Sequence, residues 1–129
     1  MPLVAHTALP TFERLRQEGQ TILSEDYAFN QDIRELHIGF LNMMPDAALA
    51  ATERQFFRLV GESNLIAQFH IHPFTLESLP RSAKAQAYLD QYYEKFADLR
   101  EQGLDALIIT GANPAAQHLE DEPFWEGLC

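Results

Sequence analysis

The stretch from Leu36 to Gly61, LHIGFLNMMPDAALAATERQFFRLVG, constrains the fold of this chain more than any other. Its short apolar run, IGFL, has the length and composition of a strand buried on both faces. Pro45 removes a backbone donor and restricts Met44 to extended conformations, so the strand ends there. Asp46 is a candidate N-cap, and Gly61 is a candidate left-handed end of the following helix. The apolar positions between them keep helical spacing: Ala48, Leu49, Phe56, Leu59 and Val60. The segment therefore predicts a strand, a tight loop and a helix.

Similar units follow along the chain. Residues 66–73 alternate between apolar and polar side chains, which predicts a strand with one less buried face, near an edge of the sheet. Ser82 is a candidate cap for a single helix over residues 83–102, in which Tyr93 would face solvent. The apolar positions expected to face the core in that helix are Tyr88, Leu89, Tyr92, Phe96 and Leu99. The run LIIT within residues 104–110 predicts another buried strand, and a further helix is expected to begin near Asp121.

Strands that alternate with helices predict parallel strands with right-handed crossovers, hence an open α/β sheet. Residues 1–34 carry weaker signals: a short helix that Thr11 would cap, and a brief strand at residues 21–24. We expect this part to be an N-terminal arm that packs over the sheet, and residues 35–129 to belong to the α/β domain proper.

Composition limits the class of function. The 129 residues carry a formal charge of −10, which argues against binding to nucleic acid or to an anionic membrane surface. The single cysteine, Cys129, cannot form a disulfide within the chain, and this fits a reducing compartment. Without a signal-peptide pattern or a spanning apolar run in the sequence, we expect a cytoplasmic location.

Two histidines invite a metal hypothesis. His70 and His72 lie two apart on one face of the predicted strand, but zinc sites in proteins take three or four protein ligands. His118 would be a third, although nothing in the spacing brings it near. We therefore expect these histidines to form a partly exposed polar strand face that binds no metal.

Several motifs, in order along the chain, resemble those of the homoserine O-acyltransferases, enzymes of methionine biosynthesis with a class I glutamine-amidotransferase-like fold. The matching segments are Gln31-Asp32-Ile33-Arg34, Leu41-Asn42-Met43-Met44-Pro45, Thr52-Glu53, Asp105 to Ala112, and Phe124-Trp125. The resemblance implies a flavodoxin-like strand order with the strand of the IGFL run at its centre. It implies acyl transfer from acyl-CoA to homoserine through an acyl-cysteine, with no cofactor, and allows a homodimer.

The resemblance also assigns roles to the two loops that follow buried strands. Gly111 and Ala112 would offer backbone amides to the oxyanion of the tetrahedral intermediate. The remaining candidates, which would contact substrate, are Asn42, Met43, Met44, Asn113 and Ala115. In the family the position of Ala115 influences the acyl donor, and a small neutral side chain there favours succinyl-CoA over acetyl-CoA. Since both loops follow parallel strands, we expect residues 42–46 and 111–115 to lie side by side.

Two departures from the family pattern stand out. A lysine pair is common in the loop after Met-Pro, whereas this chain has Asp46, Ala47 and Ala48, and this puts a cation at that loop in doubt. The family's catalytic cysteine, histidine and glutamate lie beyond the matching region, and Cys129 falls in a helix rather than at the nucleophile position. We therefore expect this chain to be the amino-terminal portion of an enzyme, inactive alone. The alternative is a non-catalytic α/β binding or interaction module.

Overall fold

The computed structural model describes residues 3–24, 35–63, 68–112, 114 and 116–129. Its five strands form one sheet in the order β2-β1-β4-β3-β5, and every neighbouring pair is parallel. The strands are β1 (Leu3–Ala5), β2 (Ile22–Ser24), β3 (Glu35–Leu41), β4 (Gln68–Phe74) and β5 (Ala106–Ile109). The part β4-β3-β5 is the flavodoxin-like order, with β3 between its two successors. The predicted open parallel α/β sheet is confirmed.

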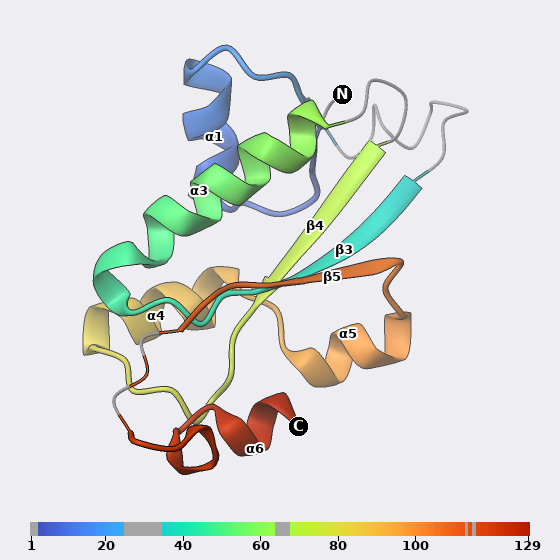
Figure 1. Cartoon of the computed structure of the whole chain (residues 1–129). Helices are drawn as coiled ribbons and strands as arrows, with labels where there is room; N and C mark the ends of the chain where they lie inside the picture. Colours follow the sequence, from blue (N-terminus) through green and yellow to red (C-terminus); the bar gives the residue numbers. More distant parts are fainter. Residues whose placement is uncertain (1–2, 25–34, 64–67, 113, 115) are drawn as a thin grey trace.

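Helices cover both sides of this sheet (Figure 1). They are α1 (Pro10–Gln17), α3 (Asp46–Glu62), α4 (Ala83–Tyr92), α5 (Phe96–Gln102) and α6 (Trp125–Leu128), with a 3-10 turn at Leu119–Asp121. On one side α1 and α3 build the larger core around Phe40, Phe57 and Ile71. On the other, Leu99 of α5 packs with Leu41 and Phe74 in a smaller core. The last helix thus begins later than Asp121, since a short 3-10 turn takes that position.

The amino-terminal residues do not merely lie over the sheet; they extend it. Strand β1 pairs with β4 on one side and with β2 on the other, and Leu3 is in the main core. Strand β4 is therefore internal, and the prediction that it lies near an edge is wrong. All seven of its residues are buried, His70 and His72 included, so they do not form a partly exposed face. Alternating polarity indicated an edge, but the pairing of β1 decided otherwise.

Strand β5 shows the opposite deviation. Its run LIIT predicted burial, yet Leu107 is 50% exposed and Ile109 48% exposed. In the described part of the chain β5 pairs with β3 alone and has no second strand neighbour. A strand sequence with apolar residues on both faces therefore leaves one face in contact with solvent here.

The long helix α3 deviates from the predicted pattern in detail. Phe57 is its fully buried aromatic residue, whereas Leu59 is 59% exposed. Gly61 does not end the helix but lies within it, and an added Cβ there would lie 3.0 Å from Leu3. Gly61 therefore lets β1 pack closely against α3. At Gly103, by contrast, the predicted helix stop is confirmed, with φ of +80° after α5.

The predicted single helix over residues 83–102 is two helices. Ser82 caps α4 as expected, its hydroxyl accepting from the Ala85 amide at 3.2 Å. The chain is then extended at Tyr93 and Lys95, because the Glu94 amide donates to the carbonyl of Pro73 at 2.9 Å. Tyr93 is buried instead of facing solvent, and Phe96 is 51% exposed instead of facing the core. Neither proline nor glycine marks this break; residues 93 and 94 are held by contacts with Asn42 and with β4.

Candidate functional site

Two loops meet at the carboxyl edge of the sheet, where open α/β folds bind ligands. The backbone amide of Met43, just after β3, donates to the hydroxyl of Thr110, just after β5, at 2.8 Å. The Thr110 amide in turn donates to the carbonyl of Leu41 at 3.0 Å. The prediction that loops 42–46 and 111–115 lie side by side is confirmed for their described residues. Asn113 and Ala115 lie outside the residues that the structure describes.

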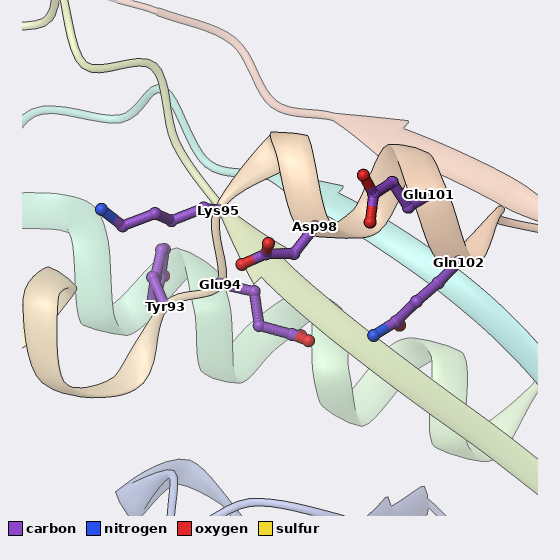
Figure 2. A pocket seen from close by; sticks show the side chains of 6 residues that line it. All are labelled: Tyr93, Glu94, Lys95, Asp98, Glu101 and Gln102. Carbon is purple, nitrogen blue, oxygen red and sulfur yellow. The ribbon is translucent and has the colours of Figure 1, made fainter.

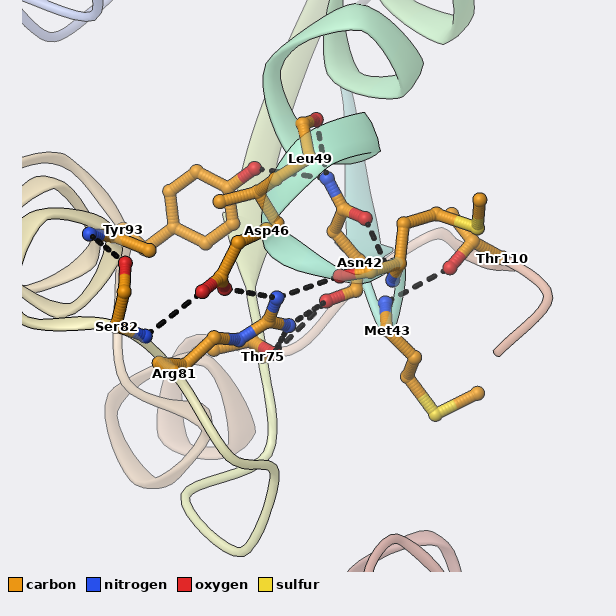
Figure 3. Close-up of polar contacts among 11 residues, drawn as sticks. Asn42, Met43, Asp46, Leu49, Thr75, Arg81, Ser82, Tyr93 and Thr110 are labelled. Atoms are coloured by element: carbon orange, nitrogen blue, oxygen red, sulfur yellow. Dashed lines mark hydrogen bonds and ion pairs between the residues drawn. The ribbon is translucent and has the colours of Figure 1, made fainter. Parts of the chain in front are cut away.

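Asn42 is the residue that organises the first loop (Figure 3). Its side chain is fully buried, and its amide nitrogen donates to the Leu49 carbonyl and to the Tyr93 hydroxyl, each at 3.1 Å. Its side-chain oxygen accepts from the Met44 amide at 3.2 Å. Burial raises the pKa of Tyr93, so its hydroxyl stays protonated. The position predicted to contact substrate is therefore occupied by an asparagine that holds the loop to α3 and to the residue after α4.

A cation does stand at this loop, although no neighbouring residue in the sequence supplies it. Arg81 lies just before α4, and its side chain is only 3% exposed. It donates to the carbonyls of Met44 at 2.6 Å and Asn42 at 3.4 Å, and to the Thr75 hydroxyl at 3.3 Å (Figure 3). The absence of the family's lysine pair had put such a cation in doubt. Sequence reasoning missed Arg81 because its partners are mostly backbone carbonyls some 40 residues away.

Asp46 does not cap its own helix. Its carboxylate accepts from the Ser82 amide at 2.8 Å and from Arg81 at 3.3 Å, whereas α3 has Pro45 at its N-cap position. The hydrogen bond from the Ser82 amide, followed by those of Arg81, lowers the pKa of Asp46. Its carboxylate therefore ties the start of α4 to the rim.

The Gly111 and Ala112 amides are the candidate oxyanion donors. Within the described part of the chain neither amide donates a hydrogen bond to another backbone carbonyl. An added Cβ at Gly111 would meet no atom within 4 Å, so the backbone there faces open space. Met43 and Met44 differ from them, because their amides are taken by Thr110 and Asn42, and the Met43 side chain is buried in the smaller core. The amides of the loop after β3 are thus used to hold that loop in place, whereas the amides of the loop after β5 are available to donate to a ligand.

Glu53 is also far from an ordinary helix-face charge. It is completely buried on α3, where the Thr11 hydroxyl donates to its carboxylate and the Tyr88 hydroxyl does so at 3.0 Å. Burial raises the pKa of Glu53, and the hydrogen bonds oppose this shift only in part. This carboxylate joins α1, α3 and α4, about two helix turns along α3 from the loop of residues 42–46.

A parallel sheet of flavodoxin-like order, with two loops bonded together at its carboxyl rim, defines an α/β protein of the kind that binds small ligands at that rim. The sequence matches the model of the homoserine O-succinyltransferase family over residues 2–129. The chain belongs to this family.

Curated relatives agree with the family match. A homoserine O-succinyltransferase of Thiothrix nivea is 86% identical over 129 residues, which is all of this chain and 36% of the relative. Homologues with the same description from Thiobacillus denitrificans and Thioalkalivibrio nitratireducens are each 70% identical, over 99% and 100% of this chain. The chain thus spans little more than a third of the length of these relatives. Among the described residues, no helix is long and apolar enough to cross a membrane.

Proposed function

We propose that this chain forms the amino-terminal part of a homoserine O-acyltransferase of methionine biosynthesis. In this reaction the homoserine hydroxyl takes an acyl group from acyl-CoA through an acyl-cysteine on a part of the enzyme outside these 129 residues. The observation that supports it most directly is the 86% identity to a homoserine O-succinyltransferase over the whole chain, rim loops included. The substrates would be homoserine and an acyl-CoA, with no cofactor, in the cytoplasm, and the family resemblance allows a homodimer.

The role of the rim follows from its hydrogen bonds. The Gly111 and Ala112 amides, which bond to no other described backbone carbonyl, would stabilise the negative oxygen of each tetrahedral intermediate. Arg81 and Asn42 would act as positioning residues, because their groups bind the loop of Met43 and Met44 from behind. Hydrogen-bond donors that are already in place cost no free energy of reorganisation when negative charge develops on the oxygen of the intermediate.

The acyl donor is proposed to be succinyl-CoA. Two observations favour it: the relatives are homoserine O-succinyltransferases, and Ala115 is small and neutral, whereas a carboxylate there would repel the succinyl tail. Replacing Ala115 by Glu should shift the kcat/KM ratio toward acetyl-CoA. A strong preference for acetyl-CoA that the substitution leaves unchanged would contradict this proposal.

A chimera tests the proposal as a whole. The 129 residues would replace the matching segment of the Thiothrix nivea relative, and transfer from succinyl-CoA to homoserine would be measured. We expect a chimera with kcat/KM similar to that of the relative. A folded chimera without transfer would favour the alternative, a non-catalytic α/β module. The isolated chain should show no turnover, because the nucleophile is expected elsewhere.

Within the chimera, two substitutions of Gly111 distinguish the effect of losing its backbone amide donor from the effect of adding a side chain. Gly111→Pro removes the amide donor, whereas Gly111→Ala keeps it and places a Cβ in open space. We expect the proline variant to lose about 10²-fold in kcat and the alanine variant to keep its rate. Equal rates in both variants would exclude the Gly111 amide as an oxyanion donor.

A further inference from the structure

Four histidine rings lie in contact with one another at strands β1, β3 and β4, a group that we call the histidine face. His70 and His72 come from β4 and His37 from β3, where it pairs in register with His70. His6 follows β1, and its ring centroid lies 4.7 Å from that of His72. Glu94, at the break between α4 and α5, accepts a hydrogen bond from His72 Nδ1 at 2.7 Å. The sequence argument that His70 and His72 have no third ligand nearby is therefore wrong.

The geometry points to a metal site: we propose that His6, His72 and Glu94 together bind one divalent transition metal ion, Zn²⁺ from the chemistry of its donors. The ligand atoms of these residues lie within 4.8 Å of one another. Glu94 Oε2 is 2.7 Å from His72 Nδ1 and 3.9 Å from His6 Nε2. Two ligands on a tetrahedral zinc are about 3.3 Å apart, a value between these distances. Small side-chain rotations would therefore complete three sides of a tetrahedron, with the fourth open.

The unused nitrogen of His6 is the strongest single sign. Its Nδ1 donates to the Val4 carbonyl at 3.3 Å, so the proton resides on Nδ1 and Nε2 carries a lone pair. That Nε2 atom is buried, and among the described residues it has no hydrogen-bond partner. A backbone carbonyl that fixes the other ring nitrogen is the usual orienting contact of a metal-binding histidine. The ring is held with its lone pair toward Glu94.

His72 also has an orienting partner. Its Nε2 lies 2.9 Å from Nδ1 of His37. When His72 Nδ1 binds the ion, its proton moves to Nε2 and is donated to His37, which carries its own proton on the other nitrogen. No net proton is gained or lost in this exchange, because both rings change only their tautomer. His37 would thus orient His72 without touching the ion.

An entry path exists beside Glu94. A surface hollow of about 590 Å³ is lined by Glu94, Asp98 and Glu101, with Tyr93, Lys95 and Gln102 completing its wall. Figure 2 shows Glu94 on this wall and over β4, with the Asp98 and Glu101 side chains along α5. Three carboxylates against one lysine give the hollow a negative field that attracts a cation. Glu94 also adjoins Tyr93, which accepts from Asn42 of the rim, so the ion would steady the same turn.

A second group, Glu35, His37 and His70, also meets the distance requirement. Two of its members are more open to solvent, since the Glu35 side chain is 41% exposed and that of His37 39%, while that of His70 is 8% exposed. In the first group the values are 10% for His6, 6% for His72 and 26% for Glu94. Buried ligands lose less rotamer freedom on binding, so we assign the ion to the first group.

The test is a titration of the folded, tag-free chain with Co²⁺ and then Zn²⁺. We expect one Co²⁺ per chain, with the visible absorption of a four-coordinate site, and displacement by Zn²⁺. Zn²⁺ should also raise the midpoint of thermal unfolding, because the ion binds the folded state. Failure to bind stoichiometrically, or equal affinity in denaturant, would overturn the proposal.

Matched variants locate the ion. Glu94→Gln and His6→Gln should each weaken Zn²⁺ binding by at least about tenfold and abolish the thermal shift. His70→Leu removes a ligand of the second group and none of the first, and His118→Gln changes an exposed histidine, so both should leave the affinity unchanged. Circular dichroism confirms that each variant is folded before titration. Loss of binding in His70→Leu with retention in Glu94→Gln would place the ion in the second group and contradict our assignment.

Discussion

The carboxyl rim and the histidine face of the same sheet satisfy their polar groups in different ways. At the rim, both terminal nitrogens of Arg81 and both polar side-chain atoms of Asn42 have hydrogen-bond partners, most of them backbone groups, and only Arg81 Nε has none among the described residues. On the histidine face, the buried Nε2 atoms of His6 and His70 have no hydrogen-bond partner among the described residues, and the nearest carboxylate oxygens lie 3.9 and 3.8 Å away. The comparison teaches that removal of a side chain should have opposite effects in the two regions. Rim residues should cost stability when lost, and an unpaired histidine should not.

The largest effect is expected at Arg81. Arg81→Met keeps the apolar stem but leaves the Met44 and Asn42 carbonyls without their charged donor. We expect a loss of about 3 kcal/mol in the free energy of unfolding, measured in urea. Arg58→Met, at an exposed position on α3, is the control and should change it by less than about 0.5 kcal/mol. Equal losses in the two variants would show that the rim is not braced by Arg81.

Asn42→Ala should rank second. It removes the donor to Leu49 and Tyr93 and the acceptor for Met44, all in a fully buried place. A loss of about 2 kcal/mol is expected, by the same unfolding measurement. Gln55→Ala, an exposed amide on α3, serves as the control. A loss no larger than that of Gln55→Ala would contradict the bracing role of Asn42.

On the histidine face, His70→Leu should change stability in the other direction. Burial lowers the pKa of His70 to about 4, so the ring is neutral near pH 7, and its Nε2 has no hydrogen-bond partner among the residues that the structure describes. Replacing it with an apolar side chain should raise the free energy of unfolding of the metal-free chain by about 1 kcal/mol. His118→Leu, at the surface, should stay within about 0.5 kcal/mol of the parent. A decrease in the free energy of unfolding on His70→Leu would show that the imidazole ring makes a stabilising contact, and it would contradict this prediction.

The smallest expected effect concerns pH and Glu53. Because burial raises the pKa of Glu53 in the folded state, the folded chain takes up this proton before the unfolded chain does. Stability from this group therefore increases as pH falls through the folded pKa toward the unfolded value, about 4.5. Urea unfolding at several pH values should show the parent gaining stability relative to Glu53→Gln on acidification. A difference that is flat, or that has the opposite sign, would contradict the assignment.

Local sequence patterns carried the prediction of the rim. The strand and helix around Asn42, the capping role of Ser82 and the stop at Gly103 were all readable, because each depends on residues within a few positions. Parallel strands then bring their carboxyl ends together, so the meeting of the two loops also followed from the pattern of elements. The role of Arg81 could not be predicted, because its partners are largely backbone carbonyls, and every residue has one whatever its side chain.

The sequence pattern by itself thus determined the parallel α/β fold and the two loops that face each other at the rim, whereas the order of the central strands was implied by the family resemblance. Only the tertiary structure decided that β1 would pair with β4 and bury two histidines. A strand of three apolar residues carries no signal in the sequence of the strand with which it pairs. The tertiary structure also decided the break after α4 that carries Tyr93 to Asn42 and Glu94 to His72. Helical propensity is worth a fraction of a kilocalorie per residue, and long-range contacts in the core outweigh it.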